Sequence, residues 1–505
     1  MGIRVKPIED DISIISFNTD EVKIDKRERD KETTGDSLKT GRAGPQKGSK
    51  YHSSRCTKFL ATWSSTLPDA VGITGIQYIV SNQDHILRRF VWLLALFGGF
   101  AAASYQTIDR TIYFLSNPKS VDYEIKYISP LEFPAVTVCN YNSYRNAALF
   151  SNVTYHPFAF LLSEVSNAIH TQQPVNYSYY ETYLTDVNTT EMYLQLAHEM
   201  EYSQMLIVAY WDGWGSVTSA NFTRVITDFG VCYTFNAGQA GQELLKQKVA
   251  GKGHGLSLML DAQQYFYFYS SKALQVSAGF VVAIHNQSEV PQVDSLGVGV
   301  APGTEVRIGL KRKEAINLEP PHGECGSKEL KYFSSYSINS CRQECLTDFV
   351  LEGCGCVEPY MAVPSDLPVC NPAKVFSCVY TETERFNSDG VCECPIPCQQ
   401  TTYTTSLSFA TFPSDFYIQT LVNLYSDFNV TPEYFSSNTL KIEIYYEELS
   451  VESMEQQEAY TFFALLCDLG GALGLWLGGS ILTFVEILDH FGHTAFLRGT
   501  AFQHS

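Results

Sequence analysis

One apolar segment near the end of the chain, residues 460–489, constrains the fold more than any other feature. It is long enough to cross a lipid bilayer, which takes about 20 residues of helix. It nevertheless contains Asp468, and a carboxylate inside a membrane is costly unless it faces water or a partner. The segment also holds glycines that weaken a helix and permit close packing, namely Gly470, Gly471, Gly474, Gly478 and Gly479. It therefore predicts either a helix that lines an ion path or an inert anchor with a glycine-rich packing face.

A second apolar segment starts at Phe90, directly after the cations Arg88 and Arg89, and predicts a span over residues 89–112. Its uninterrupted apolar part is too short to span, so we expect Asp109 and Arg110 near one membrane interface, and a buried core helix is the alternative. The positive-inside rule places the preceding region in the cytoplasm, and two spans return the C-terminus to the same side. The sequence thus predicts a multi-pass membrane protein with cytoplasmic residues 1–88 and 490–505, an extracellular domain over 113–459, and a second span over 460–489.

Glycosylation motifs and cysteines support this topology independently. Every Asn-x-Ser/Thr motif lies between the two apolar segments, at Asn152, Asn176, Asn188, Asn221, Asn286 and Asn429. All cysteines except Cys56 and Cys467 lie there as well, and most of them fall between Cys325 and Cys398. Zinc is the alternative for that cysteine block, but no histidine is interleaved with it, and an oxidising compartment favours disulfides. Cys139 and Cys232 are then left to form one longer bridge.

The chain shows few features of an enzyme or of a nucleic-acid-binding protein. Its formal charge of −19 argues against nucleic-acid binding and fits a surface that gathers cations. It lacks a zinc-protease motif, a nucleophile elbow and a phosphate-binding loop, and it indicates no cofactor and no metal site. His198, His254 and His285 are scattered and fit ordinary surface or core positions better than a catalytic set.

The predicted extracellular domain is rich in β-strands. Alternating apolar residues predict strands over 133–139, 255–260, 280–284 and 440–446. We expect one surface helix over 181–205 and another over 340–350. The fold class is therefore an α+β membrane protein in which two transmembrane helices flank a large, disulfide-rich, β-rich ectodomain.

Several motifs occur in an order and spacing that resemble the epithelial sodium channel/degenerin family, nearest to its acid-sensing and bile-acid-sensitive branches. They are Phe133-Pro-Ala-Val-Thr-Val-Cys-Asn140, Cys232-Tyr-Thr-Phe-Asn236, Gly297-Val-Gly-Val-Ala-Pro-Gly303, Ser335-Tyr-Ser337 before Cys341, and Asp468-Leu-Gly-Gly with Gly478-Gly-Ser480 and Glu486. The resemblance runs from about residue 74 to residue 489. It implies a homotrimer, or a heterotrimer with related subunits, whose ectodomain has palm, knuckle, finger, thumb and β-ball parts.

The resemblance also implies roles for individual residues. Five thumb disulfides would join Cys325 to Cys398, Cys341 to Cys394, Cys345 to Cys392, Cys354 to Cys378, and Cys356 to Cys370, with Cys139–Cys232 elsewhere. Gly478, Gly479 and Ser480 fall on the selectivity filter, Asp468 at the outer mouth, and Glu486 and Asp489 at the inner mouth. Cys467 and the linker Leu449-Ser450 would act in gating, as would Thr74-Gly75, where the family expects His-Gly.

Physical reasoning agrees with that filter. A helix over all of 460–489 would exceed a hydrocarbon core of about 30 Å, so it must tilt or break, and Gly478-Gly479-Ser480 is where it breaks most easily. Three chains would then present backbone carbonyls to a partly dehydrated Na⁺ ion, between anionic rings that favour cations.

The departures from the family pattern concern the stimulus. Tyr265-Phe266 replaces the acidic pair of proton-gated members, His322 replaces a thumb tryptophan, and a palm histidine is changed near Pro118. Glu124, Asp366 and Glu384 remain as acidic matches or near matches. These changes argue against strong proton activation, although His322 and the remaining carboxylates leave room for modulation by pH.

The sequence therefore predicts a trimeric, sodium-selective, amiloride-sensitive cation channel that is gated through its extracellular domain. The stimulus stays open among peptide, bile acid, protons, mechanical load and none. One alternative is a two-pass, cysteine-rich receptor or adhesion protein without a pore. The other is an ATP-gated trimeric channel, which the cysteine pattern and the Gly-Gly-Ser segment fit poorly.

Overall fold

The computed structural model describes residues 78–79, 85–202, 204–238, 243–268, 277–287, 289–361, 367–389, 392–424, 431–480, 482–483, 485 and 488–489. All of them belong to one compact unit, Pro68–Ser505. Several positions singled out above lie outside the described residues: Thr74, Gly75, Asp366, Asn429 and Glu486, together with most of the region before residue 85 and the tail after residue 489.

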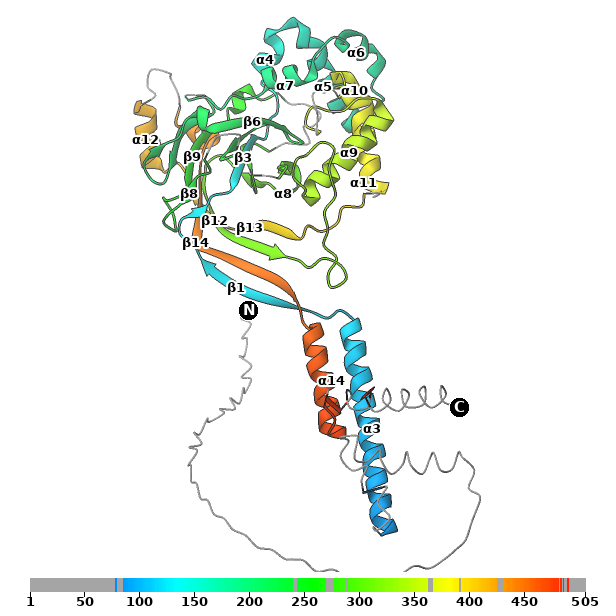
Figure 1. Cartoon of the computed structure of the whole chain (residues 1–505). Helices are drawn as coiled ribbons and strands as arrows, with labels where there is room; N and C mark the ends of the chain where they lie inside the picture. Colours follow the sequence, from blue (N-terminus) through cyan, green and yellow to red (C-terminus); the bar gives the residue numbers. More distant parts are fainter. Residues whose placement is uncertain are drawn as a thin grey trace, which may run out of the picture. The chain divides into compact units, whose positions relative to one another are not determined.

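Two apolar helices, α3 (Ile86–Leu115) and α14 (Phe462–Leu477), lie side by side (Figure 1). With 30 residues α3 is about 45 Å long, longer than the expected segment 89–112 and sufficient to cross a bilayer. With 16 residues α14 is about 24 Å long and falls short of the ~30 Å hydrocarbon core. Among the described residues, α3 is the one helix long and apolar enough for a full span. A complete second span over 460–489 therefore remains a prediction.

The larger sheet of the ectodomain carries the chain into both apolar helices. Its strands are ordered β13-β12-β14-β9-β4-β5, and β1 pairs with the other end of β14. The bounds are β1 Lys119–Tyr127, β4 Leu206–Trp211, β5 Gly215–Ser216, β9 Leu256–Asp261, β12 Thr304–Ile316, β13 Gln399–Thr411 and β14 Thr439–Glu458. Because β1 follows α3 directly and β14 precedes α14 directly, the β1–β14 ribbon connects the sheet to both helices (Figure 1).

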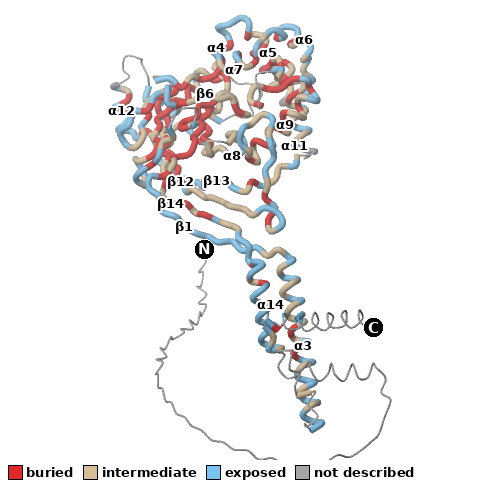
Figure 2. The backbone as a smooth tube through the Cα atoms, in the orientation of Figure 1, coloured by how far each residue is buried: buried red, intermediate tan, exposed pale blue. Residues whose placement is uncertain are grey.

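A second sheet packs against the first. Its strands are ordered β11-β10-β3-β7-β6, with bounds β3 Ala135–Asn140, β6 Phe222–Thr227, β7 Gly230–Phe235, β10 Phe280–His285 and β11 Val298–Val300. Two short strands, β2 (Leu131–Glu132) and β8 (Lys246–Gln247), pair with each other in a separate two-stranded sheet. Alternate residues such as Val138, Leu258, Ile308 and Ile442 form one shared core (Figure 2). All four strands expected from apolar alternation are present.

Helices cover the remaining ectodomain and have cores of their own. The first group is α4 (Asn146–Ser151), η1 (Val153–Tyr155), α5 (His156–Thr171), α6 (Tyr177–Leu184) and α7 (Thr189–Leu196). The second is α9 (Ile338–Cys354), α10 (Pro372–Lys374), η4 (Val375–Val379) and α11 (Tyr380–Asp389). The remaining helices are η2 (Ser219–Asn221), η3 (Gln264–Phe266), α8 (Val293–Leu296), α12 (Asp415–Leu424) and α13 (Pro432–Asn438).

The single helix expected over 181–205 is wrong. The chain instead forms α6 and α7, which are separated because Asn188 caps the start of α7 by accepting a hydrogen bond from the Glu191 amide. The segment after α7 is not helical and leads into strand β4. The helix expected over 340–350 is present as the longer α9.

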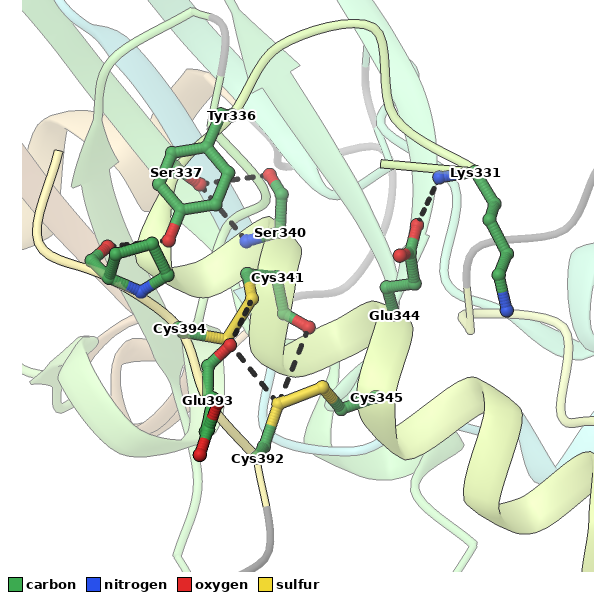
Figure 3. Close-up of a disulfide and its surroundings, with 11 residues drawn as sticks. Lys331, Tyr336, Ser337, Ser340, Cys341, Glu344, Cys345, Cys392, Glu393 and Cys394 are labelled. Atoms are coloured by element: carbon green, nitrogen blue, oxygen red, sulfur yellow. Dashed lines mark hydrogen bonds between the residues drawn. A yellow bond between two sulfur atoms is a disulfide. The ribbon is translucent and has the colours of Figure 1, made fainter. Parts of the chain in front are cut away.

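Six disulfides link twelve of the thirteen described cysteines, and their pairs coincide with those the resemblance implied: Cys139–Cys232, Cys325–Cys398, Cys341–Cys394, Cys345–Cys392, Cys354–Cys378 and Cys356–Cys370. Figure 3 shows two of them tying the first turns of α9 to residues 392–394. Their four sulfurs are close enough to hold a metal ion, but they are bonded to one another in pairs. This arrangement favours disulfides over the alternative of a zinc site.

Candidate ion pathway and gating elements

The break that the sequence predicted in the last apolar segment coincides with the end of α14. Gly478 adopts a left-handed conformation with φ of 65°, and its amide bonds to the Gly474 carbonyl, as in a helix end closed by one αL residue. Ser480 then exchanges hydrogen bonds with Thr483: its amide donates to the Thr483 hydroxyl, and its own hydroxyl accepts from the Thr483 amide. Gly478, Gly479 and Ser480 thus form a short non-helical link, in which Gly478 and Ser480 are exposed and Gly479 is partly exposed.

Asp468 lies on α14 and has two neighbours within the same protomer. The Tyr460 hydroxyl donates a 2.6 Å hydrogen bond to Asp468 Oδ2, and Arg110 Nε from α3 lies 4.0 Å from the same oxygen. The Tyr460 ring packs against Tyr113 at 5.2 Å between centroids. This cluster offsets part of the carboxylate charge, and sequence reasoning missed it because the Arg110–Asp468 contact depends on how two distant helices face each other.

The other expected pore and gating positions are dispersed along α14 and after it. Cys467 is exposed and is the one free cysteine among the described residues. Asp489 is exposed as well, whereas its expected companion Glu486 is not described. Among the described residues, Asp489 has no side-chain partner that would identify an inner mouth.

The linker Leu449-Ser450 lies inside strand β14 at an irregularity. The parallel pairing of β12 with β14 runs from Leu310 opposite Tyr446 to Arg312 opposite Val451, so four residues of β14 face one residue of β12. Ser450 is paired with Tyr127 at the end of β1, and the Leu449 carbonyl accepts a hydrogen bond from the Ile128 amide. A bulge of this kind bends a strand locally and often adjoins a functional site.

The junction between the ectodomain and α14 contains a histidine–carboxylate pair. His322 Nδ1 lies 3.6 Å from Glu458 Oε1, and Glu458 is the last residue of β14. A cavity of about 650 Å³ adjoins this pair and is lined also by Glu319 and by Pro320 and Pro321. Beyond the strand, the Ala459 amide bonds to the Pro118 carbonyl, which ties β14 to the residues that follow α3.

Burial shifts the pKa values of several groups in the ectodomain. Burial lowers the pKa of His198 to about 4 and also lowers the pKa of His285. Burial raises the pKa of Asp261, whose carboxylate accepts a 2.5 Å hydrogen bond from the Tyr434 hydroxyl, and it raises the pKa of Glu289. His198 therefore stays neutral in mild acid, and the two carboxyls take up protons at a higher pH than an exposed carboxyl would.

An aromatic cluster occupies the position of the expected acidic pair. The rings of Tyr265 and Phe266 lie 4.1 Å apart, and Tyr434 packs 5.9 Å from Tyr265. Asp261 is the carboxylate next to them, through its bond to Tyr434. Tyr265 and Phe266 themselves therefore supply no pair of carboxylates that could share a proton.

The described glycosylation motifs differ in accessibility. Four asparagines are exposed, all of them next to or at the end of a helix: Asn152, Asn176, Asn188 and Asn221. Asn286 is only partly exposed and borders a narrow polar cavity of about 230 Å³ that also contacts Glu289 and the start of α9.

Comparisons with known proteins agree with this architecture. The profile of the family described as "Amiloride-sensitive sodium channel" matches residues 69–490. The chain is 33% identical over 445 residues to acid-sensing ion channel 1C of Danio rerio, covering 82% of this chain and 80% of that protein. It is 32% identical to human acid-sensing ion channel 2 and 31% identical to the human bile acid-sensitive ion channel, in each case covering 82% of this chain and 83% of the relative.

Proposed function

Because the chain belongs to the amiloride-sensitive sodium channel family, whose members are membrane cation channels and not enzymes, we propose that it forms a trimeric, sodium-selective, amiloride-sensitive channel of the plasma membrane. In this proposal residues 460–489 complete a second span and both termini are cytoplasmic. The family favours this function over a two-pass receptor or adhesion protein without a pore.

The observation that carries the proposal is the interruption of α14 at Gly478-Gly479-Ser480. A non-helical segment at membrane depth is tolerated where it is buried in protein or lines a water-filled path. Three copies of the segment would present backbone carbonyls to a partly dehydrated Na⁺ ion, and Asp468 would attract cations above them. Gly479 also leaves room for a side chain, because a Cβ there would meet the Leu473 carbonyl at 3.9 Å, an ordinary contact distance.

Replacing Ser480 tests the assignment of the filter. With the protein expressed in oocytes, we expect Ser480→Cys to change the Na⁺/K⁺ permeability ratio, because a larger thiol replaces a hydroxyl beside the conduction path. Gly479→Ala should keep a conducting channel, since the added methyl group fits. If Ser480→Cys carries a current with the same ion selectivity and the same amiloride block as the wild type, the filter assignment is contradicted.

The gate is proposed to respond to the ectodomain without strong activation by protons. The acidic pair is replaced by Tyr265 and Phe266, and the buried His198 stays neutral until about pH 4. Asp261, Glu289 and the His322–Glu458 pair leave several groups through which pH could adjust an existing current. A large transient current on stepping wild-type oocytes from neutral pH to about pH 5 would overturn this part of the proposal.

A further inference from the structure

Trp476 links the end of α14 to the neighbouring helix α3. Its indole Nε1 donates a 3.0 Å hydrogen bond to Oε1 of Gln106, and it lies two residues before Gly478. An interhelical hydrogen bond of this kind holds two helices at one rotation relative to each other, because both side chains must keep their orientation to make it.

The backbone of α3 approaches the same tryptophan closely at Gly99. Gly99 is buried, and a Cβ atom there would lie 2.7 Å from the Trp476 carbonyl oxygen, closer than two such atoms can pack. The preceding Gly98 has no atom within 4 Å of the corresponding position. Buried alanines continue the contact, Ala103 on α3 and Ala472 on α14, so small residues allow close helix packing along this face.

Within the protomer, hydrogen bonds tie the filter segment to the last turn of α14: the Gly478 amide donates to the Gly474 carbonyl and the Gly479 amide to the Leu473 carbonyl. Gly478 and Ser480 are exposed, and neither glycine has a side chain that could pack. The direction in which the segment leaves α14 is therefore set by the last turn of that helix, and Trp476 is the residue of that turn that contacts α3 through both its backbone and its side chain.

We propose that Gln106 and Gly99 are positioning residues for ion selectivity. They hold Trp476, and through it the end of α14, so that the carbonyls of Gly478 and Gly479 meet the permeating ion at a fixed angle and depth. This inference rests on the proposed function, since it assigns a role to residues that support the proposed filter without touching the ion.

The side-chain half of the contact can be tested by a double-mutant cycle. Trp476→Phe removes the indole N–H and keeps an aromatic ring, and Gln106→Leu removes the acceptor and keeps a similar volume. Each should change the Na⁺/K⁺ permeability ratio by about threefold, the factor that corresponds to an average interhelical hydrogen bond in a membrane protein. The double variant should change the ratio no more than either single variant, because both remove the same bond.

The backbone half has a matched control in the adjacent glycine. Gly99→Ala must push α14 away and should lower sodium selectivity, whereas Gly98→Ala makes the same chemical change in the same helix with free space around it. Surface biotinylation of each variant separates altered permeation from loss of assembly. If Gly99→Ala fails to reach the cell surface, the Gln106/Trp476 double-mutant cycle alone tests the positioning role.

The outcomes distinguish this inference from the function on which it rests. Suppose that the wild-type protein gives a selective, amiloride-blocked current. If selectivity is then unchanged in Gln106→Leu and Trp476→Phe, or if the double variant shows fully additive changes, the positioning role is overturned and the channel assignment stands. Equal effects of Gly98→Ala and Gly99→Ala overturn the backbone contact. Absence of a selective current from the wild-type protein, alone and with related subunits, would instead overturn the proposed function.

Discussion

Removing the positive charge of Arg110 should raise cation conductance at low salt. Arg110 Nε lies 4.0 Å from Asp468 Oδ2, and both side chains are about two-fifths exposed. At that separation two unit charges interact by about 1 kcal/mol in a water-like dielectric, the appropriate limit for exposed groups. In Arg110→Gln the Asp468 carboxylate of each subunit loses this compensation, as does Asp109, whose Oδ2 lies 3.5 Å from the same Nε. A change of about 1 kcal/mol corresponds to roughly fivefold in local cation occupancy.

Single-channel recording at two ionic strengths measures this effect. The increase should be largest near 10 mM Na⁺ and much smaller at 150 mM, because the screening length falls from ~30 Å to ~8 Å. Asp468→Asn should lower conductance under the same low-salt conditions, and the double variant should resemble Asp468→Asn alone. A lower conductance in Arg110→Gln, or one that rises equally at both salt concentrations, would refute the argument that Arg110 offsets the charge of Asp468.

Three further predictions concern the ectodomain. His322→Ala should reduce modulation of the current by pH, since it removes one partner of the His322–Glu458 pair at the junction, whereas His254→Ala, which breaks a pair with Asp212 whose histidine is more exposed, should not; equal effects would argue against the junction. The folded-state pKa of His198 lies below its unfolded value of 6.5, so the contribution of the neutral His198 to wild-type stability should be fully present above that pH. The free energy of unfolding should fall by about 3 kcal/mol between pH 6.5 and 4, and thermal unfolding of the solubilised protein should show a smaller loss for His198→Gln. Glycosidase digestion and mass mapping should find high occupancy at Asn152, Asn176, Asn188 and Asn221 and lower occupancy at Asn286, which borders a narrow cavity.

Local apolar patterns predicted four of the described strands to within two residues at their starts. The segments expected over 133–139, 255–260, 280–284 and 440–446 correspond to β3, β9, β10 and β14, which contribute side chains to the shared core. The helix expected over 181–205 failed for a local reason, the capping residue Asn188, which sequence inspection could have read as a helix start. The glycines at 478 and 479 likewise marked the end of α14, because a left-handed residue is inexpensive there.

Contacts between segments far apart in the chain could not be predicted from local sequence patterns. The apolar sequence of α3 does not reveal which face meets α14, so neither the Gln106–Trp476 bond nor the approach at Gly99 follows from composition. The 20-residue length of β14 was underestimated because its second half is more polar, and the bulge at Leu449-Ser450 appears only when β12 is aligned beside it. These features depend on tertiary packing.

The β1–β14 ribbon explains how a change in the ectodomain can reach the proposed pore. Nine residue pairs join the strands from Lys119 opposite Glu458 to Tyr127 opposite Ser450, so the ribbon resists relative sliding of its strands along most of its length. One end meets the bulge at Leu449-Ser450, and the other continues into α3 and α14. A change in strand bending at the bulge would therefore move the outer ends of both helices together. Because Arg110 and Asp468 lie on different helices near those ends, their separation would report any motion of one helix relative to the other.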